Sequence, residues 1–524
     1  MNFKQPIRYI FLLVAITGIG LACQKNFLDK NPLDQLSGAT FWKTQGDADL
    51  ALTGCYSFFT RGSNATGVTA AGSGWGGGSM FWDAISDNAY TTSSGGNFGG
   101  ISTGAIEAAT DTSITNMLGN AYVTSYKAIA ACNNFLDNIG RVPLDAATMN
   151  KYIGEARFLR AWYYFLLTQL YGDVVLTLHP LTNDRSSATL PRTAKKIVVD
   201  SLLADLDFAA ANLPNTAYAG HAVRGAALGY KARVLLANYR WQEAAAVAQT
   251  VMTENKFSIS TGGYRNLFLK PGQNANPEIM FSVRYQPPNL ASPQDWLFSY
   301  TNSVQVLKYL VDEYDCIDGQ PITTSPLYNA ASPYDNRDPR LKLSIIIPGA
   351  WRGTTAATAF NPVTHAVPSG FLPRKGIDST RFPTTYATQS DQDWVFLRYA
   401  DILLMYAEAQ NEAVGPDNSV YTAINSVRAR AGISMPALPA GLTQADMRTR
   451  IQHERRIEFA LEGQRFFELK RWRLDRTVIP AVRDPNNSFR TFPLRDTLWP
   501  VPQSEMDIAN SYGNTGYKQT PGYN

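Results

Sequence analysis

The sequence predicts a mostly α-helical protein in which helix pairs at the two ends of the chain flank a long irregular region with short strands. Helical periodicity dominates residues 121–252 and returns from residue 393. Between these parts, residues 256–391 hold 14 of the 29 prolines and many Gly, Asn, Asp and Ser residues, a composition that favours loops and hairpins. Helix pairs that are distant in sequence must pack on one another to bury their apolar faces, so we expect a single compact body.

The N-terminal residues have the order of an export signal, with basic residues first, then an apolar run that ends in small residues. The run Ile10–Ala22 follows Lys4 and Arg8. At about 13 residues it is too short for a bilayer-spanning helix of roughly 20. We therefore expect residues 1–22 to be a cleaved signal peptide.

Cleavage there would leave Cys23 as the new N-terminus, where a cysteine accepts a bacterial lipid anchor. Leu21 departs from the usual Leu-Ala-Gly-Cys pattern, so an ordinary signal peptide followed by an incidental cysteine stays open. We expect a lipoprotein signal at 1–22 and a mature, membrane-tethered chain at 23–524.

The composition of the mature chain excludes several classes of function. Loss of residues 1–22 removes two basic and no acidic residues, so the formal net charge falls from +4 to +2. A nearly neutral chain argues against binding nucleic acid, which usually demands a strongly basic face, and against holding a membrane by charge alone. Three cysteines remain after Cys23; one bridge is possible, but buried free thiols are favoured. The four histidines share no ligand spacing, so neither a zinc site nor a His-based triad is expected.

The N-terminal part of the mature chain, 23–255, combines loops with helices. Glycine is a poor helix former, so two stretches are read as long loops, Gly72–Gly78 and Ser93–Gly104. Glu155–Leu170 has apolar residues on nearly every face, which predicts a well-buried helix. The segment LLANYRWQEAAAVA joins the alanine-rich helices Ala226–Ala237 and Trp241–Met252, and it is similar to the centre of a tetratricopeptide repeat.

The irregular insert, 256–391, follows this helix pair. Its short apolar runs Ile279–Val283 and Leu343–Ile347 are typical of strands. We expect loops, hairpins and short helices here rather than a repeat.

The C-terminal part, 392–524, returns to helices. One is expected over Asp393–Val414, and another begins after the capping signal at Thr443 and runs to Leu461. Basic and acidic residues alternate in the latter, and pairs such as Arg450 and Glu454 suit a mixed-charge helix face.

No catalytic signature is present in the sequence. It holds no dinucleotide-binding glycine motif in a strand–helix setting, no P-loop, no nucleophile elbow and no zinc-protease helix. Asp315 and Asp318 lack the alternate-residue spacing of an EF-hand loop. We therefore expect no enzyme, no cofactor and no metal. A glycosidase carboxylate pair stays open, because only the separation of two carboxylates in space identifies it.

Several segments, in order along nearly the whole mature chain, resemble the SusD/RagB family of Bacteroidetes outer-membrane nutrient-binding lipoproteins. They sit mainly on scaffold helices, and together they are highly specific. The segments are the leader at 27–56, GEARFLRAWYYFLLTQLYGDVVL at 154–176, RDPRL at 337–341, RYADILLMYAEAQNE at 398–412, AINSVRARAG at 423–432, ERRIEFALEGQRFFELKRW at 454–472, WPVPQSE at 499–505 and TPGY at 520–523.

The resemblance implies about four tetratricopeptide-like helix pairs and a loop-rich, ligand-presenting subdomain. It also implies a partner, a TonB-dependent, SusC-like outer-membrane barrel on which the lipoprotein lies as a lid at the outer face of the cell. Family members bind oligosaccharides, and in some cases other nutrients such as peptides, without cleaving them.

A sugar site needs aromatic platforms on loops beside short polar side chains, because sugar rings have apolar faces and hydroxyl rims. Two stretches of this chain fit, Gly74–Tyr90 and Gln286–Tyr300, roughly where the family draws its glycan sites. Trp82, within the first stretch, is expected in the core. The candidate ligand-binding residues are Trp75, Asp83, Asn88 and Tyr90 in the first stretch and Asn289, Asp295, Trp296 and Tyr300 in the second.

The leading hypothesis is thus a surface-anchored binding subunit of a nutrient importer. An anchored glycoside hydrolase and a helical-repeat scaffold that binds a protein are the alternatives. The sequence does not name the ligand.

Overall fold

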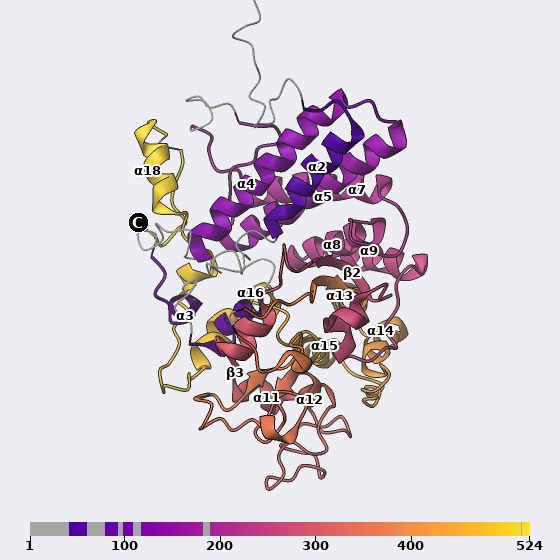
Figure 1. The fold of residues 1–524 in the computed structure, drawn as a ribbon, viewed down its shortest axis with the longest axis vertical. Helices are drawn as coiled ribbons and strands as arrows, with labels where there is room; N and C mark the ends of the chain where they lie inside the picture. Colours follow the sequence, from indigo (N-terminus) through magenta and orange to yellow (C-terminus); the bar gives the residue numbers. More distant parts are fainter. Residues whose placement is uncertain are drawn as a thin grey trace, which may run out of the picture.

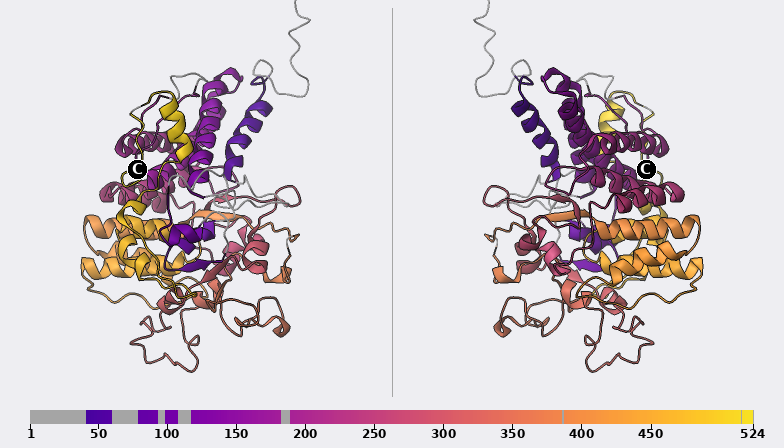
Figure 2. Two further views of the ribbon diagram at one scale, coloured as in Figure 1. Left: turned by 90° about the vertical axis from the view of Figure 1, so that its left-hand side faces the viewer. Right: turned by 90° about the vertical axis from the view of Figure 1, so that its right-hand side faces the viewer.

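The computed structural model describes residues 41–59, 79–92, 98–107, 117–181, 189–385, 387–514 and 516–523, and it confirms the mostly helical fold (Figure 1). The helices stack along one side of the molecule, while the loops of the irregular insert form the end opposite α2 and α4 in both side views (Figure 2). Within the described residues we find no helix with the length and hydropathy of a bilayer span.

The N-terminal helices pack on one another in chain order, from α4 to α9. Asp145 caps the long α5 by accepting from the backbone N–H groups of Ala147 and Thr148, and Gly172, with a φ of 73°, follows its last residue. The predicted buried helix 155–170 is confirmed as the body of α5, and the predicted alanine-rich pair is confirmed as α8 and α9. The elements are α2 (Gln45–Tyr56), α3 (Phe98–Ser102), α4 (Met117–Asn138), α5 (Ala146–Tyr171), α7 (Lys195–Asn212), α8 (Arg224–Ala237) and α9 (Trp241–Glu254).

The C-terminal helices continue this stack, since α13 packs on α9. These helices are α13 (Tyr399–Ala413), α14 (Asn418–Arg428), α15 (Gln444–Glu458), α16 (Arg465–Arg471), α17 (Asp475–Val478) and α18 (Gln503–Ser511). The irregular insert before them contains the short helices α10 (Lys270–Gln273), α11 (Lys308–Glu313) and α12 (Arg340–Ser344).

Among the described residues, three antiparallel strand pairs join distant parts of the chain. The pairs are β1 (Ala89–Thr91) with β3 (Val304–Val306), β2 (Ile279–Val283) with β6 (Trp394–Arg398), and β4 (Ile345–Ile346) with β5 (Leu372–Pro373). The strand predicted at 279–283 is confirmed as β2.

Several predicted boundaries are wrong. The helix expected from Asp393 begins only at Tyr399, because the aromatic and β-branched run before it pairs with β2 as β6. The strand expected from Leu343 begins at Ile345, because Pro339 starts the short helix α12 instead.

Two further boundaries differ from the expectation for similar local reasons. The helix expected to reach Leu461 ends at Glu458, before left-handed backbone at Leu461. The loop predicted at 93–104 contains α3, whose Phe98 stacks on Phe81 and is fully buried.

A buried ionic network connects the irregular insert to the C-terminal helices. The carboxylate of Glu458, on α15, accepts hydrogen bonds from Arg398 (2.7 Å), Arg430 (2.8 Å) and Arg340 (2.9 Å). We call the connected set of buried charges the Glu458 network. Its members are Glu278, Asp338, Arg340, Lys375, Arg398, Arg428, Arg430, Glu454, Glu458 and Glu462.

The prediction of a mixed-charge face on α15 is therefore wrong in one respect. Glu454 is buried, and it accepts from Arg340 and Arg428 on other elements rather than from a neighbour on its own helix. Local charge spacing cannot distinguish these two arrangements, because both place Arg and Glu on one helix face.

Loss of a Glu458 network carboxylate should be costly. Glu458→Gln leaves three buried guanidinium groups short of negative charge, so we expect the free energy of unfolding to fall by about 3–5 kcal/mol. Glu243→Gln is the matched control: Glu243 pairs with Arg240 at the surface, and its loss should cost about 1 kcal/mol or less. Guanidinium denaturation of both variants tests this, and equal losses would contradict it.

A second prediction concerns the stability of the protein at acidic pH. Burial would raise the pKa of Asp401, but the guanidinium groups of Arg233 and Arg455 lower it to about 2. A folded-state pKa below the ordinary 3.8 adds stability that is present above about pH 4 and is lost as the pH falls through about 2. Between pH 5 and pH 2 the wild-type protein should therefore lose about 2 kcal/mol more than Asp401→Asn. Urea denaturation across this range measures the difference, and Asp200→Asn, at an exposed carboxylate, should keep the wild-type profile.

Candidate functional site

The two loops that the sequence singles out lie side by side. Strand β1 ends the first loop and β3 follows the second, with Tyr90 opposite Gln305. The hydroxyl of Thr91 also donates to the backbone oxygen of Ser303 (2.8 Å). Backbone pairing thus brings residues more than 200 positions apart to one place (Figure 1).

Two of the predicted residues in the first loop are buried. The carboxylate of Asp83 accepts from Asn88 Nδ2 (2.8 Å) and from the backbone N–H of Gly463 (2.7 Å), while Asn88 Oδ1 accepts from Arg456 (3.1 Å). Burial raises the pKa of Asp83 to about 7. Both side chains hold the 83–88 turn against the end of α15 and present no surface in this structure. Tyr90 is half-buried, and Trp75 lies outside the described residues.

The buried residue Asp295 anchors the second loop. Its carboxylate accepts from the Ser390 hydroxyl, from Gln392 Nε2 (3.1 Å) and from the backbone N–H of Asp378 (2.8 Å), and burial raises its pKa. Asp295 therefore fastens the start of η7 (Trp296–Tyr300), a single π-helical turn, to the segment 378–392.

Three predicted residues of the second loop present side-chain surface. Trp296 is half-buried, Asn289 is exposed, and Tyr300 is 47% exposed. Trp296 and Tyr300 both belong to the single turn η7. The hydrogen bonds of Asp295 fix the start of this turn, so the positions of both side chains are defined although they lie outside any long helix or strand.

The sequence analysis missed a third aromatic residue, Trp351, which is 50% exposed. It lies on a hairpin in which the backbone N–H of Gly349 donates to Phe360 O (2.8 Å). The next residue, Arg352, is buried and donates to the backbone oxygen of Ser299 and to Asn302 Oδ1 (3.0 Å). The hairpin is thereby tied to η7. The sequence did hold a signal for Trp351, because this residue lies between two nearby glycines, at 349 and 353, as Trp75 does.

We call Trp296, Tyr300 and Trp351 the aromatic loop surface. Aromatic rings fixed on loops can pack against the apolar face of a ring-shaped ligand, while neighbouring amide and hydroxyl groups bind its polar rim. Within the described chain no cluster of His, Cys, Asp and Glu could hold a metal ion. The three described cysteines, Cys55, Cys132 and Cys316, are buried free thiols, the state that the sequence favoured.

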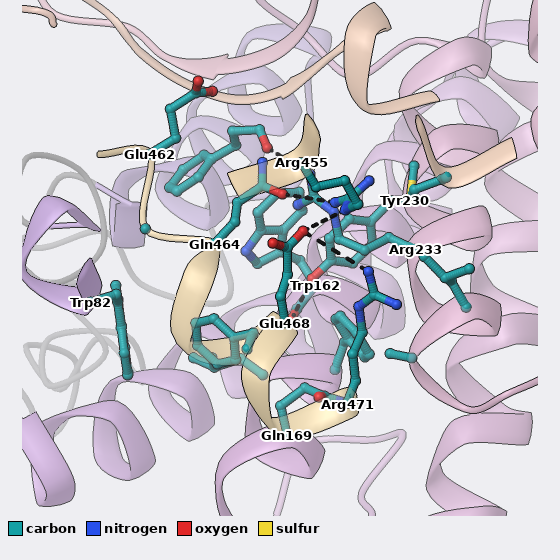
Figure 3. A pocket seen from close by; sticks show the side chains of 18 residues that line it. Trp82, Trp162, Gln169, Tyr230, Arg233, Arg455, Glu462, Gln464, Glu468 and Arg471 are labelled. Atoms are coloured by element: carbon teal, nitrogen blue, oxygen red, sulfur yellow. Dashed lines mark hydrogen bonds and ion pairs between the residues drawn. The ribbon is translucent and has the colours of Figure 1, made fainter. Parts of the chain in front are cut away.

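A cavity of about 150 Å³, partly open to solvent, lies apart from this surface, between α5, α8, α13 and α16 (Figure 3). One wall is aromatic: Trp162 and Tyr230 stack with ring centroids 4.0 Å apart, and Phe396 lies 5.1 Å from Trp162. The opposite side carries Arg455, Glu468 and other polar groups from the C-terminal helices. Its lining residues are Trp82, Trp162, Phe165, Leu166, Gln169, Tyr230, Arg233, Leu236, Ala237, Phe396, Met405, Arg455, Glu462, Gly463, Gln464, Phe467, Glu468 and Arg471.

Comparison with known proteins identifies relatives across the chain. A SusD family profile matches residues 267–523, and a profile described as starch-binding and associating with the outer membrane matches residues 79–236. SusD-like protein P2 of Formosa agariphila is 25% identical over 548 residues, covering 98% of this chain and 100% of that protein. A SusD-like protein of Bacteroides ovatus is 24% identical over 486 residues, covering 88% and 82%.

Among solved structures, the chain is similar to a SusD-like carbohydrate binding protein from Bacteroides fragilis. The TM-score is 0.78 and the identity 27%, with 90% of this chain and 99% of that one covered.

Proposed function

Because the chain belongs to the SusD family, we propose that it is a non-catalytic cell-surface lipoprotein that binds an oligosaccharide. It delivers this ligand to a TonB-dependent, SusC-like barrel in the outer membrane. The observation that carries the proposal is the similarity over nine-tenths of the chain to a carbohydrate binding protein of the same fold. The description of the N-terminal profile, starch-binding and associating with the outer membrane, supports the same reading.

The aromatic loop surface is the proposed glycan contact. Trp296, Tyr300 and Trp351 expose aromatic area on chain segments that buried hydrogen bonds hold in place. A sugar ring can place its apolar face on such a platform, and the exposed amide of Asn289 is suited to its hydroxyls. Trp75, also on a glycine-rich stretch, is kept as a further proposed contact.

We propose that residues 1–22 are removed and that Cys23 carries the lipid. The mature chain 23–524 then forms one body made of an N-terminal helical part (23–255), the irregular insert (256–391) and a C-terminal helical part (392–524). The lipid keeps this body on the outer face of the membrane beside the barrel.

The glycan contact is tested by removing its platforms. A glycan array on the mature protein first identifies a ligand, and titration calorimetry then measures its affinity. Trp296→Ala and Trp75→Ala should each weaken binding at least about tenfold, because each removes an aromatic platform worth on the order of 1.4 kcal/mol. The control is Tyr239→Ala, a 43% exposed tyrosine at the α8–α9 turn, which should bind like the wild type. Unchanged affinity in both tryptophan variants would rule out this surface, and hydrolysis products in the titration mixture would rule out a non-catalytic role.

The lipid anchor has its own test. Cys23→Ala should move the protein from the membrane fraction to the soluble exported fraction and abolish labelling by a fatty-acid probe, while glycan affinity stays unchanged. Cys316→Ala, at a buried thiol, should keep both the label and the membrane location. A Cys23→Ala protein that remains lipid-labelled would show that the anchor lies elsewhere.

A further inference from the structure

We propose that the cavity between α5, α8, α13 and α16 is a second binding site, which takes one neutral ring-shaped polyol such as a monosaccharide (Figure 3). This site is separate from the aromatic loop surface. The inference rests on the size of the cavity, on its aromatic wall and on polar atoms without partners, and it does not depend on the proposed glycan contact.

The size of the cavity sets the size of the ligand. Its volume of about 150 Å³ is on the order of ten times the minimum that holds one water molecule. It is also below the roughly 300 Å³ at which pockets for drug-sized molecules begin. One ring with its substituents fits these limits.

Two buried donors at this cavity have no acceptor among the residues that the structure describes. Arg455 is 3% exposed; its Nε donates to Glu468 (2.5 Å) and its Nη2 to Asp401 (2.8 Å), but its Nη1 has no partner within the described chain. Gln169, 9% exposed on α5, likewise has an Nε2 without a partner there. A buried donor without an acceptor destabilises the fold, so both N–H groups favour a ligand that supplies oxygen atoms.

The charges around the cavity favour a neutral ligand. Arg233 is paired with Asp401 and Arg471 with Glu408, and Arg455 is paired with both Asp401 and Glu468. An anion or a cation would add an uncompensated charge to a site whose charges are already paired. A hydroxyl group needs no counter-charge, and it can both accept and donate hydrogen bonds.

The remaining wall favours a ligand with an apolar face. Water bound only at the polar groups would leave empty the part of the cavity beside the stacked rings of Trp162 and Tyr230 and the ring of Phe396. A pyranose has hydroxyl groups on its rim and C–H groups on its faces, so it matches the polar and aromatic sides at once.

The proposal is tested by ligand-observed NMR and calorimetry on the full mature protein. The probes are D-glucose, D-galactose, D-mannose and D-xylose at millimolar concentration. We expect at least one of them to bind, and Gln169→Leu should weaken its binding at least about tenfold, the loss of roughly one hydrogen bond. Leu166→Trp, which replaces a lining leucine by a larger side chain and fills the cavity, should abolish it. Leu178→Trp, the same change at a 39% exposed leucine, should leave it unchanged, and thermal melts confirm that all three variants fold.

The two sites give separable results. Trp296→Ala should leave monosaccharide binding intact, and Leu166→Trp should leave oligosaccharide binding intact. Absence of binding by all four sugars, binding that survives Leu166→Trp, or a crystal soaked in the sugars whose cavity holds only water would each overturn the cavity site without affecting the proposed surface function.

Discussion

The fold depends on one electrostatic constraint: charges removed from water must be paired. At Glu458 this requirement joins three parts of the chain, because its arginine partners come from the irregular insert, from strand β6 and from the turn that follows α14. A helix stack alone could leave the insert loosely attached. Here the buried carboxylates of α15 serve as the ion partners of the insert, so the insert and the helices fold as one unit.

Uncharged polar groups that are removed from water also need partners, which are hydrogen bonds rather than ion pairs. This requirement positions the aromatic loop surface. Irregular chain lacks the repeated backbone bonds of helices and sheets, so its polar groups need other partners. Asp295 and Arg352 supply them beneath η7, and Asp83 supplies one at the 83–88 turn. Polar side chains under the loops thus allow the aromatic ones above them to remain exposed and ordered.

The sequence predicted the features that depend on neighbours along the chain, including the buried helix α5, the α8–α9 pair and the loop-rich character of the insert. It did not predict the partners of Glu454, which lie on other elements up to 114 residues away. Asp83, Asn88 and Asp295 were selected because a polar residue beside an aromatic one can serve a ligand or the backbone. The sequence does not show that all three side chains are buried, because burial depends on residues distant in the chain. The orphaned donors of Arg455 and Gln169 have no sequence signal, because they arise where separate helices meet.

The three strand pairs also have an evolutionary consequence. Each strand pair is at most five residues long, and it fixes the positions of the ends of the loops that leave it. The entropic free-energy cost of closing a loop grows slowly with the length of the loop, by about 0.6 kcal/mol for each doubling. The hairpin that carries Trp351 could therefore lengthen or exchange its tip at little cost to folding. Descendants of this scaffold could thus acquire new ligand preferences by loop insertion, while the Glu458 network and the helix stack stay unchanged.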